Sequence, residues 1–101
     1  SYTSALSHAS ADKRIDILRA VGASGSISQA ARDCGVSYKA AWQAIDTLTN
    51  LAGAVLVQRV VGGAGGGGAR LTAAGSQLLD VADQMAQARR QVLGRLVAAP
   101  L

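Results

Sequence analysis

Hydrophobic and polar residues alternate along the first part of the chain with the period of a helix. In residues 12–21, Ile15, Leu18 and Val21 recur at three-residue steps, so one face of a helix is apolar and charged residues occupy the other. Residues 22–25, Gly-Ala-Ser-Gly, interrupt this pattern and predict the end of the helix. We therefore expect a first helix over residues 12–21.

Two serines predict the starts of the next two helices. Ser26 is followed three residues later by Gln29, as in a capping box, and the short helix that begins there is expected to end at residues 33–35, where Gly35 suits the left-handed position. Ser37 is expected to cap a third helix that extends to about residue 52. The apolar residues predicted to form its buried stripe are Ala41, Ile45, Leu48 and Ala52.

The next part of the chain changes from a helical pattern to a strand pattern. Residues 55–61 are rich in β-branched residues and predict a strand, and residues 69–71 predict a second one. Between them, residues 62–68 contain six glycines, which excludes a stable helix. The two strands are therefore predicted to form a hairpin with a long, mobile tip.

A final helix is predicted over about residues 73–97, with Thr72 as its cap, and such a helix would be about 37 Å long. A three-helix core of this size cannot cover that length. The heptad spacing of apolar residues indicates pairing with the same helix of a second copy. The residues predicted at this dimer contact are Leu78, Val81, Ala82, Met85, Ala88, Val92 and Leu96. In the alternative interpretation, Leu78 and Leu79 pack on the local core and the rest of the helix frays.

Composition narrows the class of protein. The 101 residues suit a single domain, and one Cys and one His exclude a disulfide framework and a zinc site of Cys and His alone. Only 3% of the residues are aromatic, which favours closely packed helices over a β-sandwich or barrel. No apolar run could span a membrane and no secretory signal is visible, so a cytoplasmic protein is expected. The net charge of +4 suits nucleic acid, an acidic partner or a membrane surface without choosing among them.

Together, these elements predict a mainly α fold, namely a winged helix-turn-helix in which the hairpin is the wing. The expected organisation is a flexible N-terminal tail over residues 1–11 and a winged helix-turn-helix over residues 12–72. A dimerisation helix with a C-terminal tail is expected over residues 73–101.

The start of the third predicted helix carries the candidate base-contacting residues. In a helix-turn-helix, the helix that follows the turn meets the edges of bases in the major groove of DNA with its N-terminal end. The third predicted helix takes this position. Its first two turns contain Tyr38, Lys39, Trp42 and Gln43, which are polar or long enough to reach a base or a phosphate. The alternatives are a solvated surface for Lys39 and Gln43, packing on the turn for Tyr38, and partial burial for Trp42.

Hydroxyl groups and arginines supply the candidate phosphate contacts. The hydroxyl groups of Ser26, Ser28 and Ser37 lie at predicted helix starts, where free N–H groups and the helix dipole favour an anion. Arg59 and Arg70 flank the glycine loop and are predicted to contact phosphate or the minor groove. Pairing of these two arginines with a nearby Asp is the alternative.

Other chemistry is weakly supported by the sequence. Glycines 63, 65 and 68 match the spacing of a dinucleotide-binding loop, but no helix opens directly after them and no βαβ unit fits. Cys34 has no partner cysteine and is expected to be a small buried hydrophobic residue. The acidic residues lack a catalytic constellation, so we expect neither an enzyme nor a metal site.

Several sequence segments form a recognisable series along the chain: Ser-Gly-Ser-Ile-Ser-Gln at 24–29 with Ala31, Gly-Val-Ser-Tyr-Lys-Ala-Ala-Trp at 35–42 with Ala44 and Ile45, Leu-Val-Gln-Arg at 56–59, the glycines at 62, 63 and 65–68, and Leu-Thr-Ala-Ala-Gly at 71–75. Through these segments, residues 15–79 resemble the N-terminal winged-helix domain of the ModE-type molybdate-responsive transcriptional regulators. The LysR-type regulators share the broader plan and the Leu-Thr-x-x-Gly segment, but they usually have Phe at the position of Val57 and lack this wing and Trp42. The ModE type is therefore favoured.

This resemblance implies a dimeric, sequence-specific DNA-binding repressor or activator that is joined through its last helix. In that family a separate C-terminal region binds molybdate or tungstate. The present sequence stops at Leu101, so we expect that region to be absent, and no cofactor is assigned to these residues. Two other functions stay open, a winged helix reused for contacts with proteins and an enzyme or nucleotide-binding fragment suggested only by the glycine loop.

Overall fold

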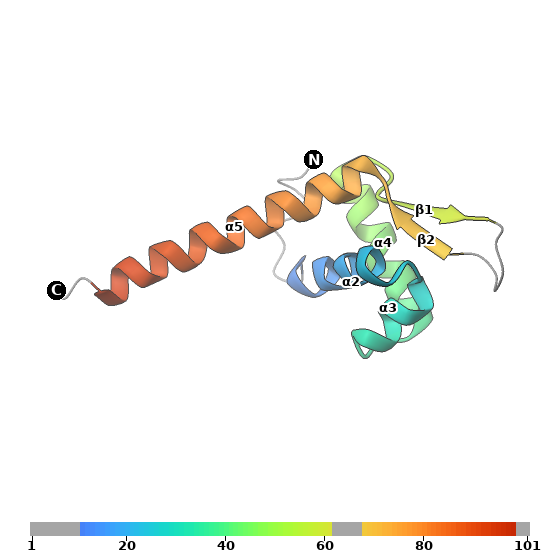
Figure 1. Ribbon diagram of the computed structural model, residues 1–101, viewed down its shortest axis with the longest axis horizontal. Coiled ribbons are helices and arrows are strands. Elements are labelled where there is room, and N and C mark those ends of the chain that lie inside the picture. Colours follow the sequence, from blue (N-terminus) through green and yellow to red (C-terminus); the bar gives the residue numbers. More distant parts are fainter. Residues whose placement is uncertain (1–10, 62–67, 99–101) are drawn as a thin grey trace.

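A computed structural model describes residues 11–61 and 68–98 of the chain (Figure 1). The mainly α fold with a two-stranded wing that the sequence predicts is confirmed. In chain order, the described elements are the helices and strands α2 (Ala11–Ser24), α3 (Ile27–Asp33), α4 (Tyr38–Ala52), β1 (Val57–Val60), β2 (Gly68–Leu71) and α5 (Ala73–Ala98).

Helix α2 is longer than the hydrophobic pattern predicts. It continues past Gly22 to Ser24, so the break predicted over residues 22–25 is wrong for the first three of these residues. Gly25 directly follows the end of the helix and has a φ of 72°, as a break there predicts. Tertiary packing explains the difference, because the Leu71 side chain of β2 lies so close to Gly22 that a Cβ there would approach it within 2.8 Å. Of the tail predicted over residues 1–11, Ala11 is helical, and residues 1–10 lie outside the described residues.

Helix α2 lies at the centre of the fold, where it contacts α3, α4, α5 and β2. Ile15, Leu18 and Val21 are buried as predicted, and Ile17, which the three-residue pattern leaves out, is buried as well. Because neighbours cover α2 on several sides, its buried arc is wider than a single apolar stripe.

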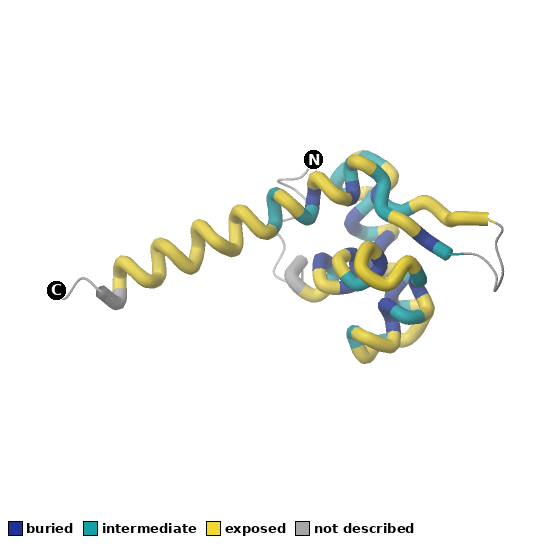
Figure 2. The backbone as a smooth tube through the Cα atoms, viewed as in Figure 1, coloured by how far each residue is buried: buried dark blue, intermediate teal, exposed yellow. Residues whose placement is uncertain are grey.

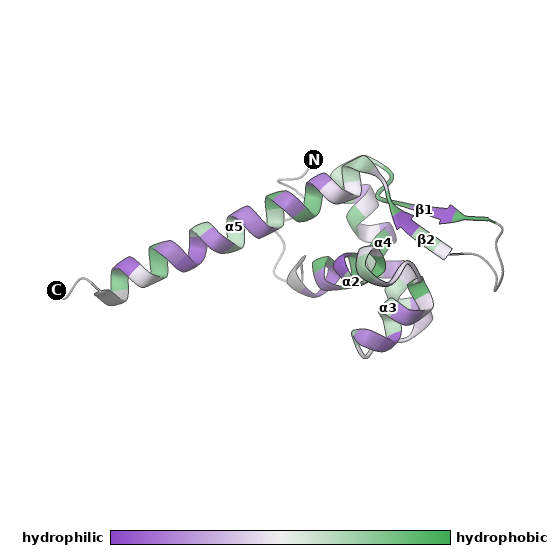
Figure 3. Ribbon diagram, viewed as in Figure 1, coloured by the Kyte–Doolittle hydropathy of each residue, from purple (hydrophilic) through white to green (hydrophobic). Residues whose placement is uncertain are grey.

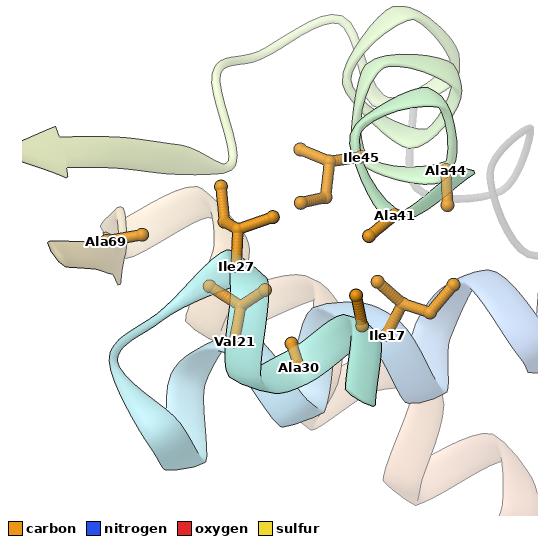
Figure 4. Packing of buried hydrophobic residues seen from close by; sticks show 9 residues of the cluster. Ile17, Val21, Ile27, Ala30, Ala41, Ala44, Ile45 and Ala69 are labelled. Carbon is orange, nitrogen blue, oxygen red and sulfur yellow. The ribbon is translucent and has the colours of Figure 1, made fainter. Parts of the chain in front are cut away.

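Two clusters of buried side chains hold the body of the molecule together. The first joins α2, α3 and α4 to β2, and Figure 4 shows its isoleucines and alanines converging between these elements. Its alanines permit close approach of the helices; they are Ala30, Ala31, Ala41, Ala44 and Ala69. The second cluster packs the start of α5 against α2 and α4 through larger aliphatic side chains, namely Ile15, Leu18, Leu48, Leu56 and Leu78.

The wing is an antiparallel ribbon of two four-residue strands. The first strand is shorter than the predicted range of residues 55–61, since its partner strand ends at Leu71, directly before the cap of α5. The predicted glycine tip falls mainly on residues 62–67, which lie outside the described residues. The register of the ribbon pairs Val57 with Leu71, Gln58 with Arg70, Arg59 with Ala69 and Val60 with Gly68.

Helix α5 begins where Thr72 caps it, as predicted. The Gly75 N–H donates to Thr72 Oγ1 (3.0 Å), and this hydroxyl donates to the carbonyl oxygen of Val55 (2.6 Å). Gly75 itself is buried against the backbone of Leu56, where a Cβ would lie 2.3 Å from the carbonyl oxygen. The first turn of α5 is therefore fixed to the segment that precedes the wing.

The outer part of α5 projects away from the rest of the molecule (Figures 1 and 2). Every side chain of residues 83–96 is exposed. We call residues 83–96 the arm, and residues 11–61 and 68–82 the body. The arm is about 21 Å long at the rise of an α-helix.

An ion pair joins the body to the base of the arm. The Arg19 guanidinium lies 2.5 Å from the Asp83 carboxylate on α5 and 3.2 Å from the Asp16 carboxylate on α2. The three side chains are largely exposed to solvent. A pair of this kind contributes about 0–1 kcal/mol to stability, so packing on the second cluster dominates the attachment of α5.

Candidate nucleic-acid interface

Helices α3 and α4 form a helix-turn-helix with both predicted caps in place. The Gln29 N–H donates to the Ser26 hydroxyl (3.1 Å), and the Ala40 N–H donates to the Ser37 hydroxyl (3.0 Å). Gly35, in the turn between the helices, has a φ of 67°, which confirms the left-handed position predicted for it. Local sequence signals therefore set where both helices start.

The capping box at Ser26 is only half formed. The Gln29 side chain donates to the Asp33 carboxylate (2.7 Å) and accepts a bond from Arg32 (2.8 Å). The Ser26 N–H donates instead to the hydroxyl of Ser24 (3.2 Å). Contacts within α3 thus draw the Gln29 amide away from the N-terminus that the sequence pattern predicts it to reach.

Helix α4 buries one face and exposes the opposite one. Ala41, Ile45 and Leu48 are buried as predicted, while Ala52, in the last turn, is only half-buried. The outward face begins with Lys39, which is exposed, and Gln43 follows one turn later and is also exposed. Tyr38 is 48% exposed at the edge of the same face. The alanine-rich core therefore holds the polar start of α4 toward solvent.

Trp42 lies at the border between the core and this outward face. It is half-buried and packs against the first cluster, so the partial burial considered from the sequence is confirmed. Its ring centroid is 6.4 Å from that of Tyr38, with a tilt of 47° between the rings. The guanidinium carbon of Arg59 lies 4.9 Å from the Trp42 ring centroid. A side chain of the wing thus contacts an aromatic residue of α4.

The two arginines of the wing lie on opposite faces of the ribbon. Arg59 pairs with the buried Ala69, whereas Arg70 pairs with Gln58, and successive residues of a strand point to opposite sides. The structure therefore brings Arg59, but not Arg70, to the predicted residues of α4. Within residues 11–61 and 68–98, neither arginine forms an ion pair with an Asp, and the alternative of local pairing is not realised.

A groove of about 330 Å³ separates the wing from the starts of α3 and α4. The described residues of its lining include Arg59 and no acidic residue, so the groove is suited to an anion. Ser28, which is exposed on α3, is brought to this groove as well. The predicted contact residues that line it are Ser26, Ser28, Tyr38, Trp42 and Arg59.

A second groove, of about 610 Å³, lies along another flank of α4 and contains cations that the sequence pattern did not single out. Lys13 and Arg14, at the start of α2, line it together with Gln43, Asp46 and Asn50 of α4. The sequence feature that could have identified Lys13 and Arg14 is that they are two adjacent cations at the start of the first helix. Their place beside Gln43 depends on how α2 crosses α4, which the sequence does not specify.

The first residues of the predicted dimer contact lie in the body, before the arm begins. Leu78 is fully buried in the second cluster of its own body, so its prediction as a dimerisation residue is wrong. Leu78 has the same heptad position as Met85 and Val92, but it lies in the part of α5 that packs on α2. Val81 and Ala82 are half-buried at this junction, and their surface is only partly available to another chain.

Farther along, hydrophobic residues recur between hydrophilic ones along the arm (Figure 3). Met85, Val92 and Leu96 are 51%, 49% and 70% exposed, and Ala88 is exposed between them. Leu93, which the heptad pattern leaves out, is 50% exposed beside them. The described part of the body does not cover this row.

The family model for bacterial regulatory helix-turn-helix proteins of the lysR family matches residues 13–76. The chain belongs to this family. The matched residues contain the helix-turn-helix, the wing and the first turn of α5. The LysR-type plan that the sequence segments share with the ModE type is thereby confirmed.

Two relatives of this lysR-family chain are a DNA-binding transcriptional regulator and a molybdenum-pterin-binding protein. The chain is 47% identical over 79 residues to the DNA-binding transcriptional dual regulator ModE of Escherichia coli (strain K12), which covers 78% of this chain and 30% of ModE. It is 49% identical over 67 residues to the molybdenum-pterin-binding protein MopB of Rhodobacter capsulatus, covering 66% of this chain and 25% of MopB. The chain thus spans less than a third of the length of these curated relatives, and the resemblance to ModE-type regulators is confirmed.

The fold is similar to that of a protein solved in complex with DNA. The chain superposes on the crystal structure of a CbnR_DBD–DNA complex with a TM-score of 0.66 at 26% sequence identity, covering 86% of this chain and 97% of that one. The similarity spans nearly the whole of that domain, so the architecture is that of a lysR-family winged helix.

Cys34, in the turn of this lysR-family domain, is half-buried and packs on the first cluster. Burial raises the pKa of its thiol above the ordinary value, and the carboxylates of Asp16 and Asp33 raise it further. A thiol with a raised pKa is mostly protonated near neutral pH and reacts slowly. The side chain therefore acts as a small packing residue, although it is half-buried rather than buried as the sequence predicts.

The described residues offer little for other ligands. No polar or charged side chain among them is buried. Across the same residues, no group of three or more His, Cys, Asp or Glu side chains could hold a metal ion. None of the described helices has the length and apolar character required to cross a bilayer.

Proposed function

We propose that this chain binds a specific sequence of double-stranded DNA as the DNA-contacting part of a transcriptional regulator. The observation that carries the proposal is the exposed polar start of α4, held outward by the packing of its alanine face on the body. A helix presented in this way fits the major groove of DNA, which is about 12 Å wide. The family and the similarity to a CbnR_DBD–DNA complex support the same conclusion.

Base readout in this proposal belongs to Lys39 and Gln43. Both side chains are exposed on the outward face of α4, one turn apart. A Lys ammonium donates to guanine O6 and N7, and a Gln amide both donates to and accepts from adenine. Tyr38, at the edge of that face, contacts a phosphate or a thymine methyl group.

Contacts with the DNA backbone surround this helix. The hydroxyls of Ser26 and Ser37 accept cap bonds, which leaves their O–H groups free to donate to a phosphate oxygen. On the wing flank, Arg59 neutralises a phosphate, and on the other flank Lys13 and Arg14 do the same. Arg70, on the outer face of the wing, contacts phosphate only if the duplex bends around the wing.

The arm is proposed to pair with the arm of a second copy of the chain. The apolar row of the arm is exposed over about 21 Å, and leaving such a row in water is unfavourable. Pairing of two arms gives a symmetric dimer whose two bodies can bind two half-sites of a palindromic sequence.

The proposed role is binding rather than catalysis, in the cytoplasm, where bacterial DNA lies. The name of MopB mentions molybdenum, but none of the described residues buries a polar or charged side chain that could hold an enclosed oxyanion. Adding molybdate to this chain is therefore expected to change neither its melting temperature nor its affinity for DNA.

Selection of bound duplexes from a random pool, followed by electrophoretic shifts at several salt concentrations, tests the proposal. Lys39→Ala and Gln43→Ala are expected to relax base preference, each by about 1–3 kcal/mol. Gln87→Ala removes an equal side chain from an exposed position of α5 and serves as the matched control. Absence of binding to any duplex at low salt, or unchanged base preference in the two α4 variants, would contradict the proposal. Binding of a protein but of no duplex would favour the protein-interaction alternative.

A further inference from the structure

Three side chains form a continuous row across the junction between α4 and the wing. Tyr38 and Trp42 lie one turn apart on α4, with ring centroids 6.4 Å apart. Arg59 of β1 continues the row, with its guanidinium carbon 4.9 Å from the centroid of the Trp42 ring. This distance is within the range of about 6 Å over which a cation is attracted to the face of an indole.

The base of the wing is fixed so that Arg59 reaches this ring. The Ala69 N–H, opposite Arg59 in the ribbon, donates to the carbonyl oxygen of Gly25 in the turn between α2 and α3 (2.9 Å). At Gly68, a Cβ would lie 2.9 Å from the same oxygen, so the backbone approaches that turn closely. The position of Arg59 is therefore set by backbone contacts outside the DNA-facing helix.

The charge of Arg59 is available to an anion. The ion pairs found within the described residues are those of Arg19 with Asp16 and Asp83, and Arg59 takes part in none. Arg59 lines the groove of about 330 Å³, and the described residues of that lining supply hydroxyl groups and no carboxylate. An indole face attracts the guanidinium but does not neutralise its charge. A phosphate group is the anion that matches such a groove beside a DNA-facing helix.

We propose that Trp42 is a positioning residue, whose ring holds the Arg59 guanidinium flat so that its N–H groups bind one particular phosphate of the DNA backbone. Trp42 itself reads no base. This inference rests on the proposed DNA binding and assigns Trp42 a role different from the direct DNA contact that the sequence predicts. It also explains why a half-buried ring packs on the core and meets the wing at the same time.

A double-mutant cycle with the full chain and its selected duplex tests this role. Arg59→Gln is expected to lower affinity on the order of tenfold and to reduce the salt slope by about 0.9, the value for one phosphate. Trp42→Leu is expected to lower affinity without changing base preference. The double variant should bind no more weakly than Arg59→Gln alone, because the ring acts through the arginine.

Arg70 supplies the matched control for this cycle. It is the other arginine of the wing but lies on the opposite face, away from Trp42. The effects of Trp42→Leu and Arg70→Gln on affinity should therefore be additive. Additivity with Arg59→Gln as well, or a changed base preference in Trp42→Leu, would overturn the proposal.

Replacing single phosphates of the duplex with neutral methylphosphonates identifies the contact itself. The wild-type chain should lose affinity at one phosphate to which Arg59→Gln and Trp42→Leu are insensitive. Trp42→Phe, which retains an aromatic face, should keep that sensitivity, and this variant carries the test if Trp42→Leu fails to fold. Equal sensitivity of all four proteins at every phosphate would refute the role of Trp42. Failure of the proposed function would be seen earlier, as absence of binding by the wild-type chain.

Discussion

Two parts of the same helix meet different surroundings. Up to residue 82, α5 packs on the body, and Leu78 is fully buried there, whereas every side chain of residues 83–96 is exposed. The heptad spacing that includes Leu78, Met85 and Val92 runs through both parts without a change. An apolar repeat therefore specifies which face of a helix is buried, but not whether the covering surface belongs to the same chain or to another.

The strongest contrast is expected between two leucines of α5. Leu78→Ala should lower the free energy of unfolding by about 2–5 kcal/mol, because it removes a fully buried side chain from the second cluster. Leu96→Ala should leave the unfolding of the body nearly unchanged, since Leu96 is 70% exposed on the arm. Chemical denaturation at low protein concentration measures both variants.

The same pair separates folding from assembly. The effect of Leu78→Ala should be independent of protein concentration, whereas any effect of Leu96→Ala should appear only at concentrations where two copies associate. Equal losses of stability at high dilution would contradict the distinction between body and arm.

Two glycines of α5 offer a second contrast, with opposite signs. In the body, Gly75→Ala would place a Cβ 2.3 Å from the Leu56 carbonyl oxygen, and the resulting displacement should cost about 1–3 kcal/mol. In the arm, no atom lies within 4 Å of a Cβ built at Gly94. Gly94→Ala should therefore stabilise the helix by about 0.5–1 kcal/mol. Circular dichroism during thermal unfolding reports both, and a destabilised Gly94→Ala would show that the arm is already packed.

The ion pair at the junction should have a smaller effect. Asp83→Arg places a cation opposite Arg19, and the double variant Arg19→Asp/Asp83→Arg restores an attraction between α2 and α5. The coupling between the two positions is expected to be about 1 kcal/mol or less and to decrease in 1 M salt. A cycle of thermal unfolding curves measures it. No coupling even at low salt would mean that packing alone directs the arm.

The smallest expected effect is a pH dependence within the body. Because burial raises the folded-state pKa of the Cys34 thiol above the ordinary 9.0, folding favours the protonated form. The corresponding stability is fully present below pH 9.0 and is lost as the pH rises through the folded-state pKa. Above pH 9.0, the melting temperature of the wild type should therefore fall relative to that of Cys34→Ala. A difference between the two melting temperatures that stays constant with pH would contradict this linkage.

Local signals account for the parts of the fold that the sequence predicts well. Ser26, Gly35, Ser37 and Thr72 act on backbone groups within a few residues, so the starts of α3, α4 and α5 can be placed without tertiary information. The exposed face of α4 is also predictable, because its period separates the buried Ala41 face from the polar one.

Other features depend on how elements cross and could not be predicted. Gly22 stays helical because Leu71 packs against it from β2, far along the chain. The opposite faces of Arg59 and Arg70 follow from the strand register, and the place of Lys13 beside α4 follows from the path of α2. The heptad position of Leu78 predicts a contact with a second chain, but that position gives no information about which surface covers the residue.

The separation of DNA contact in the body from assembly in the arm is tested most directly by sedimentation equilibrium. The wild-type chain of 10.2 kDa is predicted to approach twice that mass as its concentration rises. Val92→Asp/Leu96→Asp is predicted to remain at the mass of one chain, with the melting temperature of the body unchanged, because both positions are exposed in a single copy. A wild-type chain that stays at 10.2 kDa at every concentration, or a double variant that still dimerises, would contradict it.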